Sequence, residues 1–343
     1  MLLVVIIVAI VFFMFTGAVL HSTLLKEKLA HIKPYGQLFD VYDGKLHLYS
    51  VGNGNKTIVL LPGLAVPLPS ADFAPLMRQL SKDYTVACIE YFGVGFSSET
   101  SRPRTCENYV EEIRYALKNA GFKPPYVLLP HSLSTVYSEY YASKYPEEVE
   151  AVISLEGPST ADIVEMPAGI KHLLPIVKFL QFIGLTSLMA CFSINKKHLY
   201  PYGYSDNEIS DMAAFAGFFI NDTLIKQISN VPEFVKQTMG MPFPKSTAYF
   251  KVICRKTYET PNKQLKMTPQ EYQRRHLERI GENSKCEILD GTHFIYLNNV
   301  DRIVEITHNV LKQSCSAIPS TDVVLPPATD EKSSAHLLDI TNK

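Results

Sequence analysis

The chain of 343 residues lacks a strong charge of either sign, because 33 Lys and Arg side chains are almost balanced by 34 Asp and Glu side chains. A nearly neutral chain has no basic field to attract nucleic acid, and the basic motifs with interleaved aromatic residues that bind it are missing too. We therefore expect no nucleic-acid partner. The hydrophobic content of 46% allows a large core, in one elaborated domain or in two.

The six cysteines lack the spacing of a metal or redox site, since no two of them form a CxxC pair. Cys88, Cys254 and Cys286 fall in or beside apolar, strand-like runs, where a small buried thiol is the expected state. The sequence therefore predicts no metal and no organic cofactor.

Charged side chains are absent from the first twenty residues, MLLVVIIVAIVFFMFTGAVL. As a helix, this stretch would measure roughly 30 Å and could cross the hydrocarbon core of a bilayer. The competing interpretation, a cleaved signal peptide, needs a basic start, a shorter apolar stretch and a small-x-small cleavage site. None of these is clear, so we predict that residues 1–21 form a single-pass membrane anchor. Lys26, Lys28 and Lys33 follow it, which favours the cytoplasmic side for the main domain.

The remaining sequence is organised as apolar runs that alternate with amphipathic stretches. Such alternation with short links predicts parallel strands joined by crossover helices, at 35–157 and again at 246–314. Residues 158–245 interrupt it: they are rich in Phe, Leu, Ile and Met and predict an inserted helical lobe. Residues 315–343 are polar and contain proline, which predicts a flexible tail.

The stretch LLPHSLST, residues 128–135, has the pattern of a nucleophile on a sharp turn between a strand and a helix. Ser132 would be that nucleophile, although serine before a helix is often only an N-cap. Glycine is missing from the two flanking places, which hold Pro130 and Ser134. Neither substitution removes an atom that acid–base chemistry requires.

From about residue 40 to residue 312 the chain resembles the α/β-hydrolase family. The resemblance depends on LLPG, EYFGVGFSS, HSLS, YASKYPEEVEAVISLEG and DGTHFIYLNN, which occur in the family's order. It implies an α/β fold with a mostly parallel central sheet flanked by helices and an inserted helical cap. It also implies a serine hydrolase similar to membrane-anchored esterases and lipases of the bacterial type. One departure is Glu90, which stands where the family usually has aspartate.

The resemblance implies that His293, in the loop after the last strand, is the catalytic base. His131 occupies a place often filled by histidine in this family, and His276 lies within a charged helix. Two carboxylates compete for the third position. Glu156 ends an apolar strand, where a buried carboxylate needs a partner such as an imidazolium, whereas Glu259 follows the next strand, at the commoner family site. We favour Glu156 and keep Glu259 as the alternative.

The resemblance further implies an oxyanion hole made from the backbone N–H groups of Leu64 and Leu133. Because backbone groups supply it, the identity of the two side chains carries little information.

Together these features predict ester hydrolysis through an acyl-enzyme on Ser132. The anchor and the apolar lobe suggest a hydrophobic small-molecule ester as substrate. An acyltransferase on the same fold is one alternative, and a noncatalytic binding or scaffold protein that keeps the pocket is the other.

Overall fold

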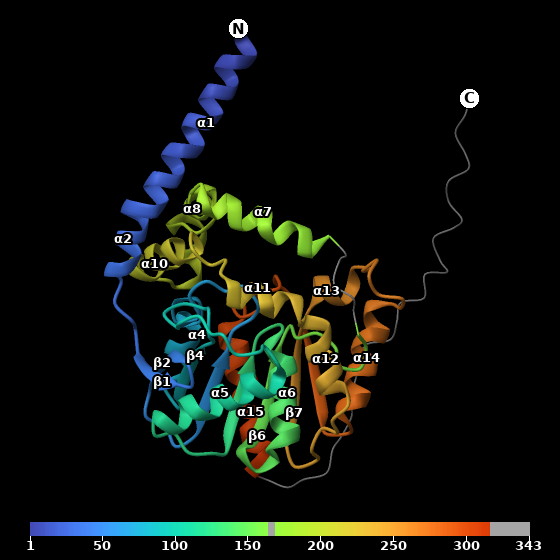
Figure 1. Cartoon of the computed structure of the whole chain (residues 1–343). Coiled ribbons are helices and arrows are strands. Elements are labelled where there is room, and N and C mark those ends of the chain that lie inside the picture. The colour runs from blue at the N-terminus through green and yellow to red at the C-terminus, as the bar shows by residue number, and fades with distance from the viewer. Residues whose placement is uncertain (164–168, 316–343) are drawn as a thin grey trace, which may run out of the picture.

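The computed structural model describes residues 1–163 and 169–315. Its centre is an eight-stranded sheet with the strand order β1-β2-β4-β3-β5-β6-β7-β8 (Figure 1). The strands β3 to β8 pair in parallel, whereas β2 pairs antiparallel with both β1 and β4. The mostly parallel sheet expected from the sequence is therefore confirmed. The strands are β1 (Gln37–Val41), β2 (Gly44–Val51), β3 (Thr57–Leu61), β4 (Thr85–Glu90), β5 (Tyr126–Pro130), β6 (Val149–Leu155), β7 (Ala248–Cys254) and β8 (Ser284–Leu289).

Both faces of the sheet are covered by helices, which explains why its strands are continuous apolar runs rather than alternating ones. In β5, Leu128 belongs to the core on one face, while Val127 and Leu129 belong to the core on the other. The helices that contribute to the first core are α5 (Cys106–Asn119), α6 (Ser134–Lys144), α12 (Val231–Met239) and α14 (Pro269–Ile280). The second core is completed by α4 (Ala74–Leu80) and α15 (Val300–Cys315).

Between β6 and β7 the described residues form helices and no strand, and we call this part the insertion. Its longer helices are α7 (Ile170–Phe182), α8 (Leu185–Ser193), α10 (Asp206–Ala216), α11 (Asp222–Ser229) and α12, with the short α9 (Lys196–Leu199) and η3 (Tyr200–Tyr202) among them. The long apolar run is bent by 86° between α7 and α8. Gly184, at φ 76°, makes that corner.

The chain begins with α1 (Leu2–Leu20), which continues through the π-helical turn η1 (His21–Leu25) into α2 (Lys26–His31). None of the residues of α1 is buried, and the helix projects away from the sheet (Figure 1). It is long and apolar enough to cross a membrane, a property that a signal sequence near the N-terminus shares. Apart from Cys315, the last residue of α15, the predicted tail at 315–343 lies outside the described residues.

The remaining helices each form about one turn within a loop: α3 (Pro69–Asp72), η2 (Pro146–Glu148) and α13 (Arg255–Glu259). The last of these directly follows β7, at the carboxyl edge of the sheet. This edge is where polar side chains from separate strands converge, as expected for an open parallel sheet.

Candidate active site

Ser132 lies on a sharp turn between β5 and α6, at the carboxyl end of a central strand of the sheet. Its φ of 53° is uncommon for a residue with a side chain and is a mark of local strain. Two backbone hydrogen bonds hold the turn: the N–H of His131 donates to Leu61 on one neighbouring strand, and the N–H of Ser132 donates to Leu155 on the other. The nucleophile position predicted from the sequence is therefore a strained, tightly held elbow.

The elbow packs closely against the loop after β3, where only glycine leaves enough room. A Cβ atom on Gly63 would lie 2.7 Å from the ring of His131 and 3.0 Å from the Cβ of Ser132. At the flanking place where glycine was expected, Ser134 is buried, its hydroxyl donates to the carbonyl of Pro62, and it lies 2.8 Å from the Tyr91 hydroxyl. The Ser134 side chain is thus accommodated by two partners, which explains how the turn forms without that glycine.

His293 lies in the loop after β8, between the two other polar groups. Its Nε2 lies 2.9 Å from Ser132 Oγ, and its Nδ1 lies 3.3 Å from Glu156 Oε2. The imidazole side chain remains 51% exposed, whereas that of Glu156 is 3% exposed. A serine, an imidazole and a carboxylate are therefore aligned within hydrogen-bond reach, with the reacting end open to solvent.

Glu156 comes directly after β6, in a left-handed conformation with φ 56°. The N–H of Cys254, at the end of β7, donates to its Oε1, and the Thr257 hydroxyl donates to its Oε2 at 2.8 Å. These two hydrogen bonds fix the direction of the carboxylate toward the His293 ring. Thr257 and the Cys254 N–H were not anticipated from the sequence.

Glu259 follows the neighbouring strand but does not join this group. It ends α13, its side chain is 57% exposed, and it lies 3.5 Å from Arg255 one helical turn earlier. The two carboxylates that the sequence left in competition thus have opposite environments.

A family model described as alpha/beta hydrolase fold matches residues 56–221. The wild-type Cfl2 structure from Burkholderia cenocepacia superposes with a TM-score of 0.60 at 16% identity, over 80% of this chain and 94% of the other. The chain has the α/β-hydrolase fold.

Two further similarities come from Bacillus subtilis. The protein YbdG of strain 168 is 26% identical over 304 residues, which is 85% of this chain and 90% of the relative. The carboxylesterase CesB has a TM-score of 0.54 at 13% identity, covering 86% of this chain and 98% of the esterase. At such low identity the structural matches concern the fold.

His131, next to the nucleophile position, is almost completely buried. Its Nε2 lies 2.9 Å from the backbone oxygen of His293, so this nitrogen carries the proton and donates. Burial, reinforced by the neighbouring His293, lowers the pKa of His131 to about 3, so the ring stays neutral. His131 therefore ties the His293 loop to the elbow, a role that its position before Ser132 in the sequence does not reveal.

The backbone beside the elbow has two N–H groups that are free to donate. Among the described residues, neither the Leu64 N–H nor the Leu133 N–H donates to a protein acceptor. Leu133 lies at the N-terminus of α6, and Leu64 precedes Ala65, whose φ of 60° is again left-handed. Free N–H groups at the start of a helix suit an anion.

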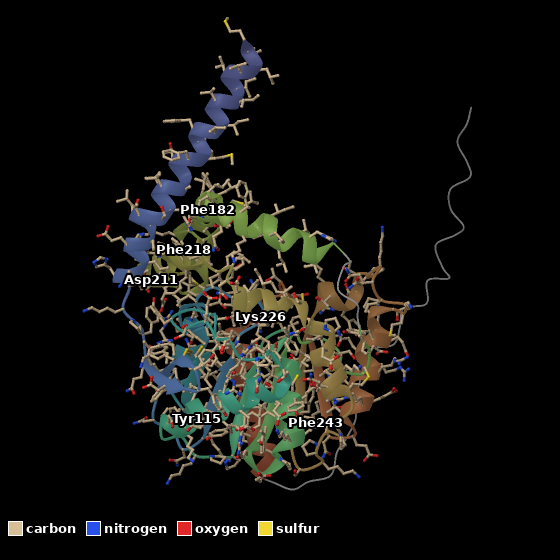
Figure 2. The ribbon with its side chains drawn as sticks, viewed as in Figure 1. Tyr115, Phe182, Asp211, Phe218, Lys226 and Phe243 are labelled. Atoms are coloured by element: carbon tan, nitrogen blue, oxygen red, sulfur yellow. The ribbon has the colours of Figure 1, made fainter. Side chains whose placement is uncertain are left out.

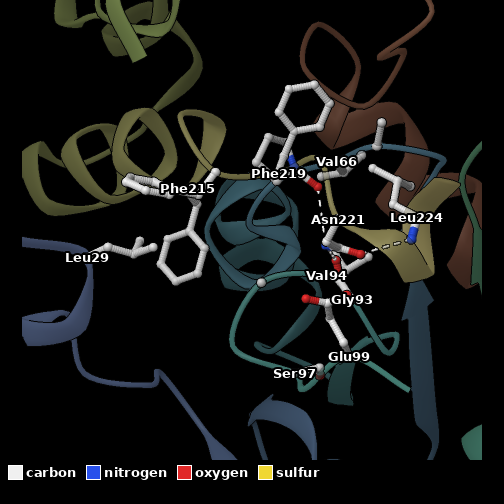
Figure 3. A pocket seen from close by; sticks show the side chains of 14 residues that line it. Leu29, Val66, Gly93, Val94, Ser97, Glu99, Phe215, Phe219, Asn221 and Leu224 are labelled. Atoms are coloured by element: carbon white, nitrogen blue, oxygen red, sulfur yellow. Dashed lines mark hydrogen bonds between the residues drawn. The ribbon is translucent and has the colours of Figure 1, made fainter. Parts of the chain in front are cut away.

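Two cavities lie beside the site. The first, about 290 Å³, begins at Ala65 and is lined by apolar side chains together with the polar Ser97, Glu99 and Asn221 (Figure 3). Its apolar side chains are Leu29, Val66, Val94, Phe215, Phe218, Phe219 and Leu224. The second, about 1110 Å³, is an open groove that borders His293 and includes Lys256 and Lys263. Within the described ranges, no cluster of three His, Cys, Asp or Glu side chains could hold a metal ion.

Proposed function

We propose that the chain is a serine hydrolase that cleaves carboxylic esters of hydrophobic, amphipathic molecules through an acyl-enzyme. The observation that carries this proposal is the alignment of Ser132 Oγ, the His293 ring and the Glu156 carboxylate at 2.9 Å and 3.3 Å. That order of groups is the one that nucleophilic acyl transfer requires. The α/β-hydrolase fold supports the same reaction class.

In the proposed mechanism, His293 Nε2 removes the proton of Ser132 as Oγ attacks the ester carbonyl. The imidazolium that forms keeps its Nδ1–H directed at Glu156, which the Cys254 N–H and the Thr257 hydroxyl hold in place. The N–H groups of Leu64 and Leu133 stabilise the negative oxygen of the tetrahedral intermediate.

His293 then gives its proton to the leaving alcohol, and the acyl group remains on Ser132. A water molecule, deprotonated by the same imidazole, attacks the acyl-enzyme and releases the carboxylic acid. The exposure of the His293 ring supports this second half of the reaction, because water reaches Nε2 from the open side.

The two cavities support an amphipathic substrate. The chamber that begins at Ala65 offers apolar side chains to an acyl chain, and the groove with Lys256 and Lys263 offers basic side chains to a polar or anionic leaving group. The insertion would act as the cap over this site. Leu174 of α7 belongs to a buried apolar cluster of the insertion, and Leu64 and Ala65 pack against the same cluster.

The proposal is tested by labelling the detergent-solubilised full-length chain with a fluorophosphonate probe. We expect one label on Ser132, none in Ser132→Ala, and unchanged labelling in the control Ser210→Ala, an exposed serine of the insertion. A wild-type chain that is folded yet does not react would overturn the hydrolase proposal. Product analysis with an added alcohol then separates release of free acid, the expected result, from acyl transfer.

A further inference from the structure

Helix α7 has two apolar faces, and only one of them is covered. The inner face packs Leu174 into a buried cluster with Ile220, Leu224 and Ile228 of the insertion. The outer face and the adjoining α8 leave large side chains at 47% to 72% exposure. We call these six residues the hairpin face: Leu173, Ile176, Phe179, Phe182, Met189 and Phe192. A contiguous exposed patch of this kind marks an interaction surface.

Charge is kept away from the hairpin face. Lys178 of α7 is 2.6 Å from Asp222 of α11, at the base of the insertion. Basic side chains occur instead at the ends of the apolar surface, where Lys197 follows α8 and Lys26 and Lys28 follow α1. An apolar face with basic residues at its margin is the pattern of a helix lying in a lipid interface.

The first helix is fixed to the corner of this hairpin, so the two cannot take independent positions. A Cβ atom on Gly17 would lie 2.2 Å from the carbonyl oxygen of Ile183, which shows that the two backbones touch. One helical turn later, the His21 ring stacks on Phe218 with 4.0 Å between centroids, and its Nδ1 lies 3.3 Å from Ser187 Oγ. In Figure 1, α1 rises from the side of the molecule on which α7 and α8 lie, and Figure 2 shows Phe182 on that same side.

The position of this contact along α1 indicates how deep the corner between α7 and α8 would lie in the bilayer. The helix Leu2–Leu20 is about 28 Å long at ~1.5 Å per residue, hardly less than a hydrocarbon core of ~30 Å, so spanning the core takes its whole length. Gly17 lies three residues before the end of that helix, or about 5 Å on the membrane side. Interfacial helices bury their apolar faces to ~5–10 Å, so the hairpin corner lies at the depth expected for such a helix.

We infer that the α7–α8 hairpin is embedded in the near leaflet of the bilayer beside α1, and that the esters cleaved at Ser132 are bilayer lipids. The second half of this inference rests on the proposed function. The inner face of α7 and the Leu64 loop pack against the same buried apolar cluster of the insertion, so one apolar layer joins the hairpin to that loop. The chamber that begins at Ala65 is also lined by Leu29 of α2, the helix that continues the anchor. The chamber therefore lies between the membrane helix and the candidate site.

Depth-dependent quenching tests the embedding directly. Single cysteines at Val8, Phe182 and Tyr115 are labelled with an NBD fluorophore in the full-length chain. Cys191, Cys286 and Cys315 are replaced by serine, and Cys88, Cys106 and Cys254 are buried. The chain is reconstituted into phosphatidylcholine and phosphatidylglycerol vesicles that carry nitroxide on the acyl chains. Tyr115 is the matched control, since it is an exposed aromatic residue on the opposite end of the molecule (Figure 2).

We expect the labels at positions 8 and 182 to lose about half or more of their fluorescence, as interfacial depth requires, and the label at 115 to lose little. Quenching at 8 without quenching at 182 would overturn the inference while leaving the anchor intact. If position 8 is not quenched either, the membrane anchor itself is wrong and the inference falls with it.

Hydrolysis of a lipid ester in vesicles provides a second test of the inference. The variant Phe179→Ser/Phe182→Ser/Met189→Ser should lose roughly tenfold or more of its hydrolysis of a vesicle-borne lipid ester, because membrane contact scales with buried apolar area. Hydrolysis of a soluble short-chain ester and fluorophosphonate labelling should be unchanged, and Tyr115→Ser should change nothing. Equal rates of the variant and the wild type on vesicles would overturn the lipid assignment. Failure of Ser132 to react with the probe would instead contradict the proposed function.

Discussion

Two of the histidine–carboxylate pairs on this fold differ in their exposure and in the group that meets the second ring nitrogen. His293 faces Glu156 at 3.3 Å with an imidazole that is 51% exposed. His276 of α14 faces Glu139 of α6 at 2.8 Å, and both side chains are completely buried. The first pair has a serine hydroxyl on the second ring nitrogen, whereas the second pair has the ammonium group of Lys251 there, at 2.5 Å.

The buried pair is one part of a closed network. Tyr249 donates its hydroxyl to Glu139 Oε1 at 2.8 Å, and Arg279 lies 3.1 Å from Oε2. Burial, with Lys251 beside the ring, lowers the pKa of His276 to about 4. Burial alone would raise the pKa of Glu139, but its contacts with His276, Arg279 and Thr160 outweigh burial and lower it to about 2. Every nitrogen of His276 is occupied by protein, so the ring has no free position for substrate. A histidine–carboxylate contact thus indicates chemistry only where the ring also meets a nucleophile and solvent.

Replacing each imidazole in turn is the most direct test of the difference between the two pairs. His293→Gln should lower kcat by roughly 10⁴-fold or more, because the general base is lost. Its melting temperature should stay close to that of the wild type, since the ring is half exposed. His276→Gln should behave in the opposite way, with kcat per folded molecule nearly unchanged and a lower melting temperature. Ester hydrolysis and thermal unfolding in detergent measure the two effects, and a His276 variant that is folded but inactive would contradict the distinction.

Replacing Glu156 and Glu259 in turn tests which of these carboxylates orients the His293 ring. Glu156→Gln should lower kcat by roughly 10²- to 10⁴-fold, because the amide no longer orients the ring or stabilises the imidazolium. Glu259→Gln is the matched control on the adjacent strand and should leave kcat within about twofold, as expected for an exposed pair. A large loss of kcat in the Glu259 variant, with little change in the Glu156 variant, would contradict the assignment of Glu156.

Glu139→Gln should act on stability. It leaves Arg279 and His276 buried without their carboxylate, and breaking a buried pair from one side costs about 3–5 kcal/mol. Denaturant unfolding measures the change in free energy, with Glu278→Gln, an exposed carboxylate on the same helix as His276, as the control. A loss below about 1 kcal/mol, the value of a surface pair, would show that the network is not closed.

These environments could be anticipated only in part. The alternation of apolar runs and helices was enough to predict the sheet, and the apolar strand before the Ser132 turn indicated the elbow. The preference for Glu156 over Glu259 came from the cost of burying a carboxylate without a partner, and the distances agree with that preference. The partners of Glu156 could not be anticipated, because Thr257 and the Cys254 N–H arrive from the next strand, about a hundred residues later.

For His276 the sequence analysis gave only its place in a charged helix, which is α14, and did not anticipate its environment. The side chain is completely buried. Tyr272, His276 and Ile280 are spaced by four residues, so the helical period already put His276 on the covered face. Lys251 and Glu139 gave no comparable signal. Lys251 is the one charged residue of an apolar strand, Glu139 lies in a helix of mixed polarity, and each finds its partner only through tertiary packing.

The smallest predicted effect is the response of stability to pH. Burial lowers the pKa of His131 to about 3 and that of His276 to about 4, from 6.5, so the unfolded chain binds these protons first. Their contribution to stability is complete above pH 6.5 and is lost as the pH falls. Burial also raises the pKa of Asp72 to about 6, so its contribution has the opposite sign, present at low pH and lost as the pH rises.

Between about pH 7.5 and about pH 5.5 the two histidines lower the free energy of unfolding by roughly 3 kcal/mol and Asp72 returns a little under 1, which leaves a net loss of about 2 kcal/mol. Chemical denaturation at the two pH values measures this loss, and His276→Gln should roughly halve the histidine share. Greater stability at the lower pH would contradict the assignment of neutral buried histidines.

The contact between Gly17 and Ile183 fixes the first helix against the folded domain, so this helix is more than an exchangeable tether. Many apolar sequences of the same length would hold a protein at a membrane, but a side chain at position 17 would meet the Ile183 carbonyl and push the helix away from the hairpin corner. A chimera with an unrelated transmembrane segment would therefore stay attached while losing its fixed tilt. If the proposed membrane placement holds, the absence of a side chain at position 17 would help to set the distance between Ser132 and the lipid surface.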